Sequence, residues 1–118
     1  MSKQESLLKR AYVAFNARDI DGALALMQPD IDWPNAWEGG RALGKAAVRD
    51  YWTRQFAAID PHVEPVAFEE TAPGIVAVRV HQVVRDLSGT ILSDGFVVHT
   101  YTIRDGLVER MDVSDDRR

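Results

Sequence analysis

The sequence predicts an α+β fold in which three helices cover one face of a curved antiparallel sheet. Two observations support this prediction. Apolar residues recur at helical spacing up to Ile59, and from His62 onward they alternate with polar residues. Helices followed by a run of neighbouring strands are typical of α+β domains, in which the helices pack against one side of the sheet.

The helices are bounded by capping and breaking residues. Ser2 and Glu5 form a capping pattern for the first helix. Its inner face consists of Leu7, Leu8, Ala11, Tyr12 and Phe15. Asp19 can cap a short second helix that ends before Pro29. The inner face of that helix consists of Ile20, Ala23, Leu24 and Met27. A third helix follows Gly44 and ends at Asp60-Pro61. Its inner residues are Ala47, Val48, Tyr51, Trp52, Gln55, Phe56 and Ile59.

The strands are separated by turn sequences. A short strand at Ile31–Trp33 comes before the third helix. Four more are expected at His62–Glu70, Ile75–Leu87, Thr90–Arg104 and Leu107–Val113. The turns between them are Ala72-Pro73-Gly74, Ser88-Gly89 and Asp105-Gly106. Residues 1–118 are expected to form one domain with a core of about 7–113, and the charged end, Asp115 to Arg118, is expected to fray.

The hairpin at Ser88-Gly89 predicts which residues point into the core. If its loop has two residues, Val78 lies opposite His99 and Val76 opposite Tyr101. The alternate positions 76, 78 and 80 are all valine, whereas the positions between them are mixed in character. The valine side is therefore the expected inner face, and His99 and Tyr101 point inward with it.

The register of the last strand has two alternatives. A two-residue turn at Asp105-Gly106 places Asp112 opposite His99. A three-residue turn with a glycine bulge instead places Met111 there and points Leu107 and Val113 inward. The second alternative is preferred because it buries the apolar side chains.

Composition excludes several classes of function. The 118 residues have a formal net charge of −4 and no internal basic run, so no nucleic-acid-binding surface is expected. No cysteine is present, which excludes a disulfide scaffold and a thiolate nucleophile. The chain has neither a secretory signal nor a membrane-spanning run, so a cytoplasmic protein that does not contact a membrane is expected. The three histidines come from different segments with no ligand spacing, so no metal site is expected. No cofactor is expected either.

A loop rich in tryptophan points to a cavity for a small molecule. Trp33 and Trp37 flank a stretch that contains Pro34, and Gly39-Gly40 follows. Proline and glycine disfavour regular structure here, so the aromatic rings are held by a shaped loop. Rings in such a position are expected to line or cover a binding cavity.

The order of elements resembles the nuclear transport factor 2-like superfamily, and within it the SnoaL-like and ketosteroid-isomerase-like proteins. The resemblance covers about Leu7 to Val113. Its most recognisable segments are Tyr12 to Ala23, Pro29 to Trp33 and Gly44 to Trp52. It implies a cone-shaped barrel of cystatin-like architecture with a conical cavity between the helices and the concave face of the sheet. It also implies a homodimer that packs through the outer face of the sheet.

The resemblance assigns roles to several residues. In ketosteroid isomerases, a helix tyrosine and a protonated sheet aspartate hold the enolate oxygen, while a separate carboxylate moves the proton. Tyr12 falls at the tyrosine position, His99 at the sheet aspartate and Trp52 at a supporting aromatic residue. The proton-moving carboxylate falls at Asn35, or at Trp33 with a gap, and neither side chain can take a proton. The inward aspartate–arginine–aspartate set of limonene-epoxide-hydrolase-like proteins is not visible either.

His99 and Tyr12 are the candidate catalytic residues. A neutral His99 could donate a hydrogen bond to an oxyanion, or accept a proton if its pKa stays near 6.5. The alternative is a buried structural histidine that is hydrogen-bonded to Tyr12, Tyr101 or the backbone. Asn35 would position substrate or water. The candidate ligand-binding residues are Trp33, Asn35, Trp37, Trp52, Val78, Tyr101 and Met111.

Two classes of function agree with these features. The first is a small-molecule-binding protein with a conical apolar pocket that acts as a cofactor-free isomerase, hydratase or cyclase on an apolar, oxygen-bearing substrate. The alternative is a module of the same fold that binds a ligand without chemistry or acts through its dimer surface. The expected partners are a small apolar ligand and a second copy of the chain. In a still simpler alternative, the tryptophans and His99 fill the cone and leave no cavity.

Overall fold

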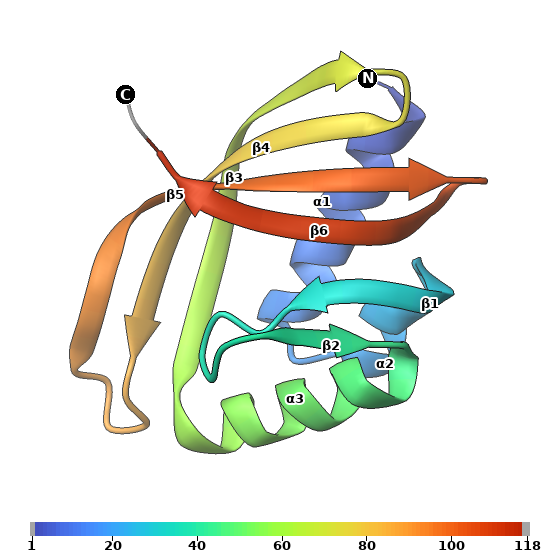
Figure 1. The fold of residues 1–118 in the computed structure, drawn as a ribbon. Helices are drawn as coiled ribbons and strands as arrows, with labels where there is room; N and C mark the ends of the chain where they lie inside the picture. Colours follow the sequence, from blue (N-terminus) through green and yellow to red (C-terminus); the bar gives the residue numbers. More distant parts are fainter. Residues whose placement is uncertain (1, 117–118) are drawn as a thin grey trace.

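The helices begin where the capping residues predict. A computed structural model describes residues 2–116, and its helices are α1 (Lys3–Asn16), α2 (Ile20–Leu24) and α3 (Lys45–Ala58) (Figure 1). Ser2 Oγ accepts a hydrogen bond from the backbone N–H of Glu5, and the Asp19 carboxylate accepts one from that of Gly22. The second helix is shorter than predicted, because Met27 already belongs to the first strand.

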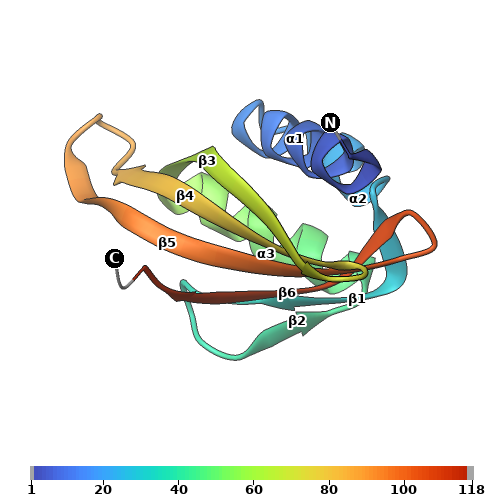
Figure 2. The ribbon, with the colours of Figure 1, turned by 90° about the horizontal axis from the view of Figure 1, so that it is seen from above.

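Six strands form one sheet in the order β2-β1-β6-β5-β4-β3. They are β1 (Met27–Pro34), β2 (Arg41–Leu43), β3 (Asp60–Ala72), β4 (Ile75–Arg85), β5 (Ile91–Arg104) and β6 (Leu107–Asp115). All neighbours are antiparallel except β1 and β6, so the sheet is mixed rather than wholly antiparallel as predicted. No hairpin joins β1 to β6, and so no turn sequence indicates their relative direction. Figure 2 shows the curvature of the sheet, with the helices on one side.

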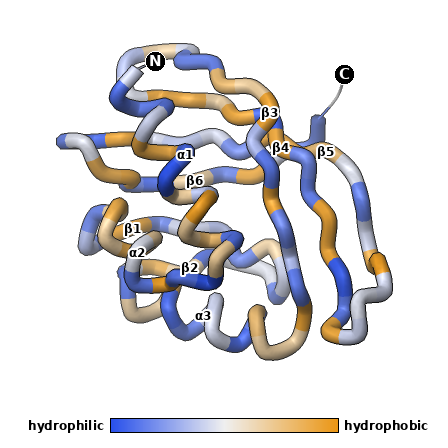
Figure 3. The backbone as a smooth tube through the Cα atoms, turned by 180° about the vertical axis from the view of Figure 1, so that it is seen from behind, coloured by the Kyte–Doolittle hydropathy of each residue, from blue (hydrophilic) through white to orange (hydrophobic). Residues whose placement is uncertain are grey.

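The predicted inner face of the sheet is confirmed. Val76, Val78 and Val80 expose 2%, 0% and 0% of their surface, and His99 and Tyr101 are buried beside them. Orange apolar segments alternate with blue polar ones along much of the strands in Figure 3, as expected for a sheet with one covered face. The helices contribute Leu8, Val48 and Trp52 to the same core.

The register between β4 and β5 is as predicted, although the loop that joins them is longer. Val78 pairs with His99, and Val76 pairs with Tyr101. The loop is closed by a hydrogen bond from Asp86 N–H to the Thr90 carbonyl oxygen, and a bulge shifts the register next to Arg85. The longer loop and the bulge offset one another, so the pairing at His99 is unchanged.

The register between β5 and β6 differs from both predicted alternatives. His99 lies opposite Val113, and Tyr101 lies opposite Met111. The two-residue turn forms, with Arg104 opposite Leu107, and the bulge follows Val108 instead of occurring in the turn. Met111 therefore points inward as predicted, but Leu107 does not, because the fully buried Val108 takes that place.

Strand β2 was not predicted, and a cluster of four charged side chains joins it to β1 and to β6. On the exposed face, Arg41 of β2 contacts Asp32 of β1 at 2.7 Å and Asp112 of β6 at 3.1 Å. Arg110 of β6 contacts the same two carboxylates, each at 2.8 Å. Each arginine thus bridges both aspartates. The pairs Arg41–Asp112 and Arg110–Asp32 join residues that are 71 and 78 positions apart, so local sequence patterns do not indicate them.

The C-terminal end is ordered further than predicted. Strand β6 continues to Asp115, and the Asp116 carboxylate accepts a hydrogen bond of 2.6 Å from Arg79 Nε. This ion pair is enclosed, because the Asp116 side chain is only 7% exposed. Fraying of the arginines that follow remains a prediction, since positions 117 and 118 lie outside the described residues. Within residues 2–116, no helix combines the length and apolar character that crossing a bilayer requires.

Candidate functional site

A cavity of about 100 Å³ lies between the helices and the inner face of the sheet. Its walls come from all three helices and from β1, β3, β4, β5 and β6. Most of the lining is apolar or aromatic, including Phe15, Met27, Trp33, Trp52, Val63 and Met111. The simplest alternative from the sequence was that side chains fill the cone and leave no cavity. The cavity shows that they do not fill it.

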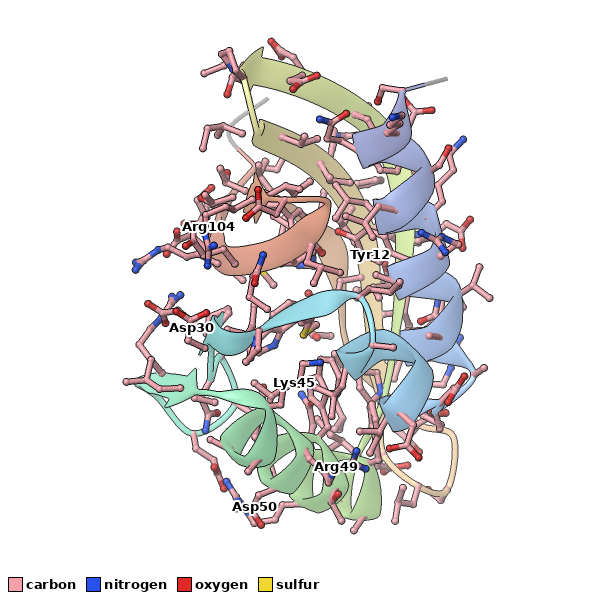
Figure 4. The ribbon with its side chains drawn as sticks, turned by 90° about the vertical axis from the view of Figure 1, so that its right-hand side faces the viewer. Tyr12, Asp30, Lys45, Arg49, Asp50 and Arg104 are labelled. Atoms are coloured by element: carbon pink, nitrogen blue, oxygen red, sulfur yellow. The ribbon has the colours of Figure 1, made fainter. Side chains whose placement is uncertain are left out.

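A chain of hydrogen bonds joins three aromatic residues in the wall of this cavity. Tyr12 points from α1 toward the sheet (Figure 4), and its hydroxyl lies 2.8 Å from Nδ1 of His99 on β5. The hydroxyl of Tyr101, also on β5, donates to the Tyr12 oxygen at 2.8 Å. The rings of Tyr12 and His99 are nearly parallel, at 9°, with centroids 5.9 Å apart. The sequence brought His99, Tyr12 and Tyr101 to one site, and the structure joins them directly.

The directions of these bonds place the imidazole proton. The Tyr12 oxygen accepts a hydrogen bond from the Tyr101 hydroxyl, so we assign the single proton of the Tyr12 hydroxyl to the bond with Nδ1 of His99. Nδ1 is then the acceptor, and a neutral His99 has its proton on Nε2. Nε2 has no hydrogen-bond partner among the described residues. Every fully enclosed side-chain nitrogen or oxygen among those residues does have a partner, so Nε2 is not fully enclosed. With this assignment, Nε2–H is a donor without a partner among the described residues, on a side chain that lines the cavity.

Burial keeps all three groups neutral near pH 7. It lowers the pKa of His99 to about 4, so the imidazole has no charge at neutral pH. It raises the pKa of Tyr101 and, together with the adjacent Tyr101 hydroxyl, that of Tyr12, so both phenols keep their protons. The sequence left open whether the His99 pKa stays near its ordinary value, and burial in the apolar interior lowers it.

Two of the three tryptophans line the cavity. Trp33 on β1 and Trp52 on α3 meet edge to face, with centroids 5.4 Å apart and an interplanar angle of 86°. Trp33 also lies 6.4 Å from the ring of Tyr101, and Trp52 lies 5.6 Å from that of Phe15. These contacts form a rigid aromatic wall beside the hydrogen-bonded chain.

The sequence predicted that Asn35 and Trp37 line the cavity, and this prediction is wrong: the loop after β1 directs neither side chain to it. The Asn35 amide donates to the Glu38 carboxylate at 2.9 Å, and its carbonyl oxygen accepts from the Glu38 backbone at 2.7 Å. Asparagine often closes turns in this way, and here both polar groups of its side chain make hydrogen bonds within the turn. Trp37 is 39% exposed and is not part of the lining; its neighbour Ala36 is.

This loop is fastened to helix α3. Arg54 Nη2 donates to Glu38 at 2.6 Å, and this hydrogen bond is the main cause of the lowered pKa of Glu38. Burial raises the pKa of the Tyr51 hydroxyl in the cavity wall, and the nearby loop backbone at Trp37 and Ala36 partly opposes this shift. The loop therefore forms a fixed part of the cavity wall.

Three further expectations concern the strands. Met111 lines the cavity as predicted, whereas Val78 is fully buried and lies outside the lining. Val113, opposite His99, contributes to the lining as well. Among residues 2–116, no group of three or more histidines, cysteines or carboxylates is arranged to hold a metal ion.

Three polar lining residues were missed by the sequence analysis. They are Tyr51, Gln55 and Gln82. Each had a signal: Tyr51 and Gln55 lie on the inner stripe of the third helix, and Gln82 continues the alternation of Val76, Val78 and Val80. Because Gln82 is polar, the apolar alternation that indicates the inner face ends before it.

Fold and site together define a helix-covered curved sheet that encloses a small-molecule-sized cavity. The chain belongs to the SnoaL-like domain family, which its residues 8–111 match, and thereby to the nuclear transport factor 2-like superfamily. This confirms the family resemblance. No curated protein sequence is significantly similar to the chain.

Solved structures share the fold over almost the whole chain. TerC, co-crystallised with polyporic acid, is 29% identical, with a TM-score of 0.85 over 98% of this chain and 92% of TerC. RV0760c from Mycobacterium tuberculosis, in complex with estradiol-17beta-hemisuccinate, is 22% identical, with a TM-score of 0.83 and coverages of 99% and 96%. A candidate polyketide cyclase from Sinorhizobium meliloti is 20% identical, with a TM-score of 0.80 and coverages of 97% and 100%. The last two show a common fold alone.

Proposed function

We propose that this protein binds a small, largely apolar molecule whose oxygen atom accepts a hydrogen bond from Nε2–H of His99. The observation that supports this most is the free Nε2–H donor at the end of the chain from Tyr101 through Tyr12 to His99. The aromatic wall of Trp33 and Trp52 would hold a flat ring by stacking and exclude water. The small molecules bound by TerC and by RV0760c support the same use of the cavity.

The size of the cavity limits the ligand. An engineered cavity of about 150 Å³ in another protein binds benzene. The cavity here is about 100 Å³ and is partly open, so we expect it to take one small ring. A larger ligand would extend through an opening or require the lining to move.

The same geometry supports cofactor-free chemistry on a carbonyl compound. A neutral imidazole N–H can stabilise the oxygen of an enolate as negative charge develops on it, which assists isomerisation or aldol-type cyclisation. With a pKa of about 4, His99 is a poor proton acceptor at neutral pH, and no aspartate or glutamate is among the described residues of the lining. The proposed role of His99 is therefore oxygen polarisation, with Tyr12 as the residue that orients it. Binding without turnover is the alternative that the missing carboxylate favours.

Ring-sized ligands are expected to quench tryptophan fluorescence in a saturable way. The panel to test is phenols, monoterpene epoxides, steroids and polyketide-like aromatics. Single-ring probes should bind best because of the cavity volume, and a Trp37→Phe variant should keep the response because Trp37 lies outside the lining. His99→Ala, checked for folding by circular dichroism, should bind a ketone probe at least about tenfold more weakly. No quenching by any probe would contradict the proposal, and product formation above the buffer rate would separate an enzyme from a binding module.

We also propose that the chain forms a homodimer through the outer face of β4 and β5. Phe96 is 43% exposed there, with the Arg79 guanidinium 3.9 Å and the His81 ring 5.0 Å from its ring centroid. An exposed aromatic residue framed by polar groups is typical of protein interfaces. Sedimentation is expected to show a dimer, and a Phe96→Asp variant should shift it toward the monomer. A single 13.2 kDa species at high concentration would refute the dimer.

A further inference from the structure

Gln82 is a polar side chain on an otherwise apolar row. Along the inner face of β4, the fully or almost fully buried Val76, Val78 and Val80 are followed by Gln82, which lines the cavity. Within the part of the chain that the structure describes, the Gln82 carboxamide makes no hydrogen bond. Both its N–H donors and its carbonyl oxygen are thus available to a molecule in the cavity.

The neighbours of Gln82 leave its amide uncovered. Gln82 pairs with Val63 on one side and with Gly95 on the other. Paired residues point their side chains to the same face of the sheet. Val63 therefore places a side chain beside the Gln82 amide, whereas Gly95 has none to place there. A Cβ built on Gly95 would meet no atom within 4 Å, which shows open space next to Gln82.

Gln82 and His99 both line the cavity from the sheet and lie several residues apart along the strand direction. His99 is opposite Val78, which is four positions before Gln82 on the same strand. At a rise of roughly 3.3 Å per residue, the two rows are at most about 13 Å apart. A single ring with oxygen atoms at opposite positions, plus a hydrogen bond of roughly 2.9 Å at each end, spans a comparable length.

We infer that the ligand is a single-ring compound with two oxygen atoms at opposite ends, of the 4-hydroxyphenyl ketone type. Its carbonyl oxygen accepts from Nε2–H of His99, and its hydroxyl donates to the Gln82 carboxamide oxygen. The cavity volume of about 100 Å³ fits one ring, and its apolar walls fit the ring faces. This inference rests on the proposed function and adds a second anchor, which makes Gln82 a specificity-determining residue.

The test compares two probes, 4-hydroxyacetophenone and acetophenone, by isothermal titration calorimetry. The wild-type protein is expected to bind the hydroxylated probe about tenfold more tightly, a difference of about 1.4 kcal/mol. In Gln82→Met, which keeps the length of the side chain but removes the amide, this preference should vanish while acetophenone binds as before. Gln4→Met, the same change on α1 outside the lining, should keep the preference.

The outcomes separate this inference from the proposed function. Equal affinities of the two probes for the wild-type protein, or a preference that survives in Gln82→Met, would overturn the inference and leave the cavity function standing. If Gln55→Met abolishes the preference for the hydroxylated probe and Gln82→Met does not, the second hydrogen-bonding group lies on α3 and the inference is overturned. Failure of both probes to bind the wild-type protein would overturn the inference together with the proposed function. Gly95→Leu, which fills the open space, should weaken both probes.

Discussion

Acidification from about pH 7 to about pH 4 is expected to remove roughly 3 kcal/mol of folding stability through His99 alone. The pKa of His99 is lowered to about 4 in the folded protein, whereas an unfolded chain has an ordinary value near 6.5. Between these two values, the unfolded state binds the proton and the folded state does not, so stability falls as the pH falls. Above about pH 6.5 the neutral His99 costs the folded state nothing relative to the unfolded state. Each unit by which the folded-state pKa is lowered contributes about 1.36 kcal/mol to the loss of stability in acid.

The pH series should be measured by urea unfolding of the wild-type protein and of His99→Leu. Exposed carboxylates such as Asp112, whose pKa is lowered mainly by Arg110, also lose stabilising contacts in acid. Both proteins share those carboxylates, so the difference between the two curves isolates the imidazole. It should shrink by roughly 3 kcal/mol between about pH 6.5 and about pH 4. Parallel curves over that range would contradict a neutral, buried His99.

Much of the sheet could be predicted because the two strands that position His99 share one hairpin. The alternation of valines up to Val80 identified the inner face, and the turn at Ser88-Gly89 then placed His99 on it. The register survived a longer loop because the bulge next to Arg85 offset it. The bulge after Val108 and the strand at Arg41–Leu43 were missed, since they depend on distant contacts such as that between Arg41 and Asp112.

Cavity-lining residues could be predicted from the sequence where a helical or strand periodicity fixes the direction of the side chain. Trp52 and Tyr101 lie on such patterns, and both line the cavity. Asn35 and Trp37 lie in an irregular loop, where the turn geometry directs each side chain and no period indicates it. The proton on Nε2 of His99 follows only from the three-residue hydrogen-bond chain, which exists once α1 lies against β5.

Tyr12→Phe is expected to destabilise the protein by roughly 3 kcal/mol, several times more than the matched change at Tyr101. The Tyr12 oxygen accepts from Tyr101 and donates to His99, so its removal leaves two buried groups without a partner, each at about 1–3 kcal/mol. The Tyr101 hydroxyl lies 3.5 Å from Nδ1, so a small movement could restore one bond and keep the loss toward the lower end. Tyr101→Phe removes a terminal donor, and the bond from Tyr12 to His99 survives; its expected cost is about 1 kcal/mol.

The two variants also separate stability from ligand binding. Without the Tyr12 proton, Nδ1 of His99 loses its close donor, since the Tyr101 hydroxyl lies 3.5 Å away, and the imidazole can present a lone pair to the cavity. A ketone probe should then bind about tenfold more weakly to Tyr12→Phe and nearly normally to Tyr101→Phe, as measured by calorimetry. Equal losses of stability and of affinity in both variants would show that the Tyr12 hydroxyl has no special role in orienting His99. A loss in Tyr12→Phe alone would show that the middle hydroxyl orients His99, because the two substitutions remove the same atom type from neighbouring buried positions.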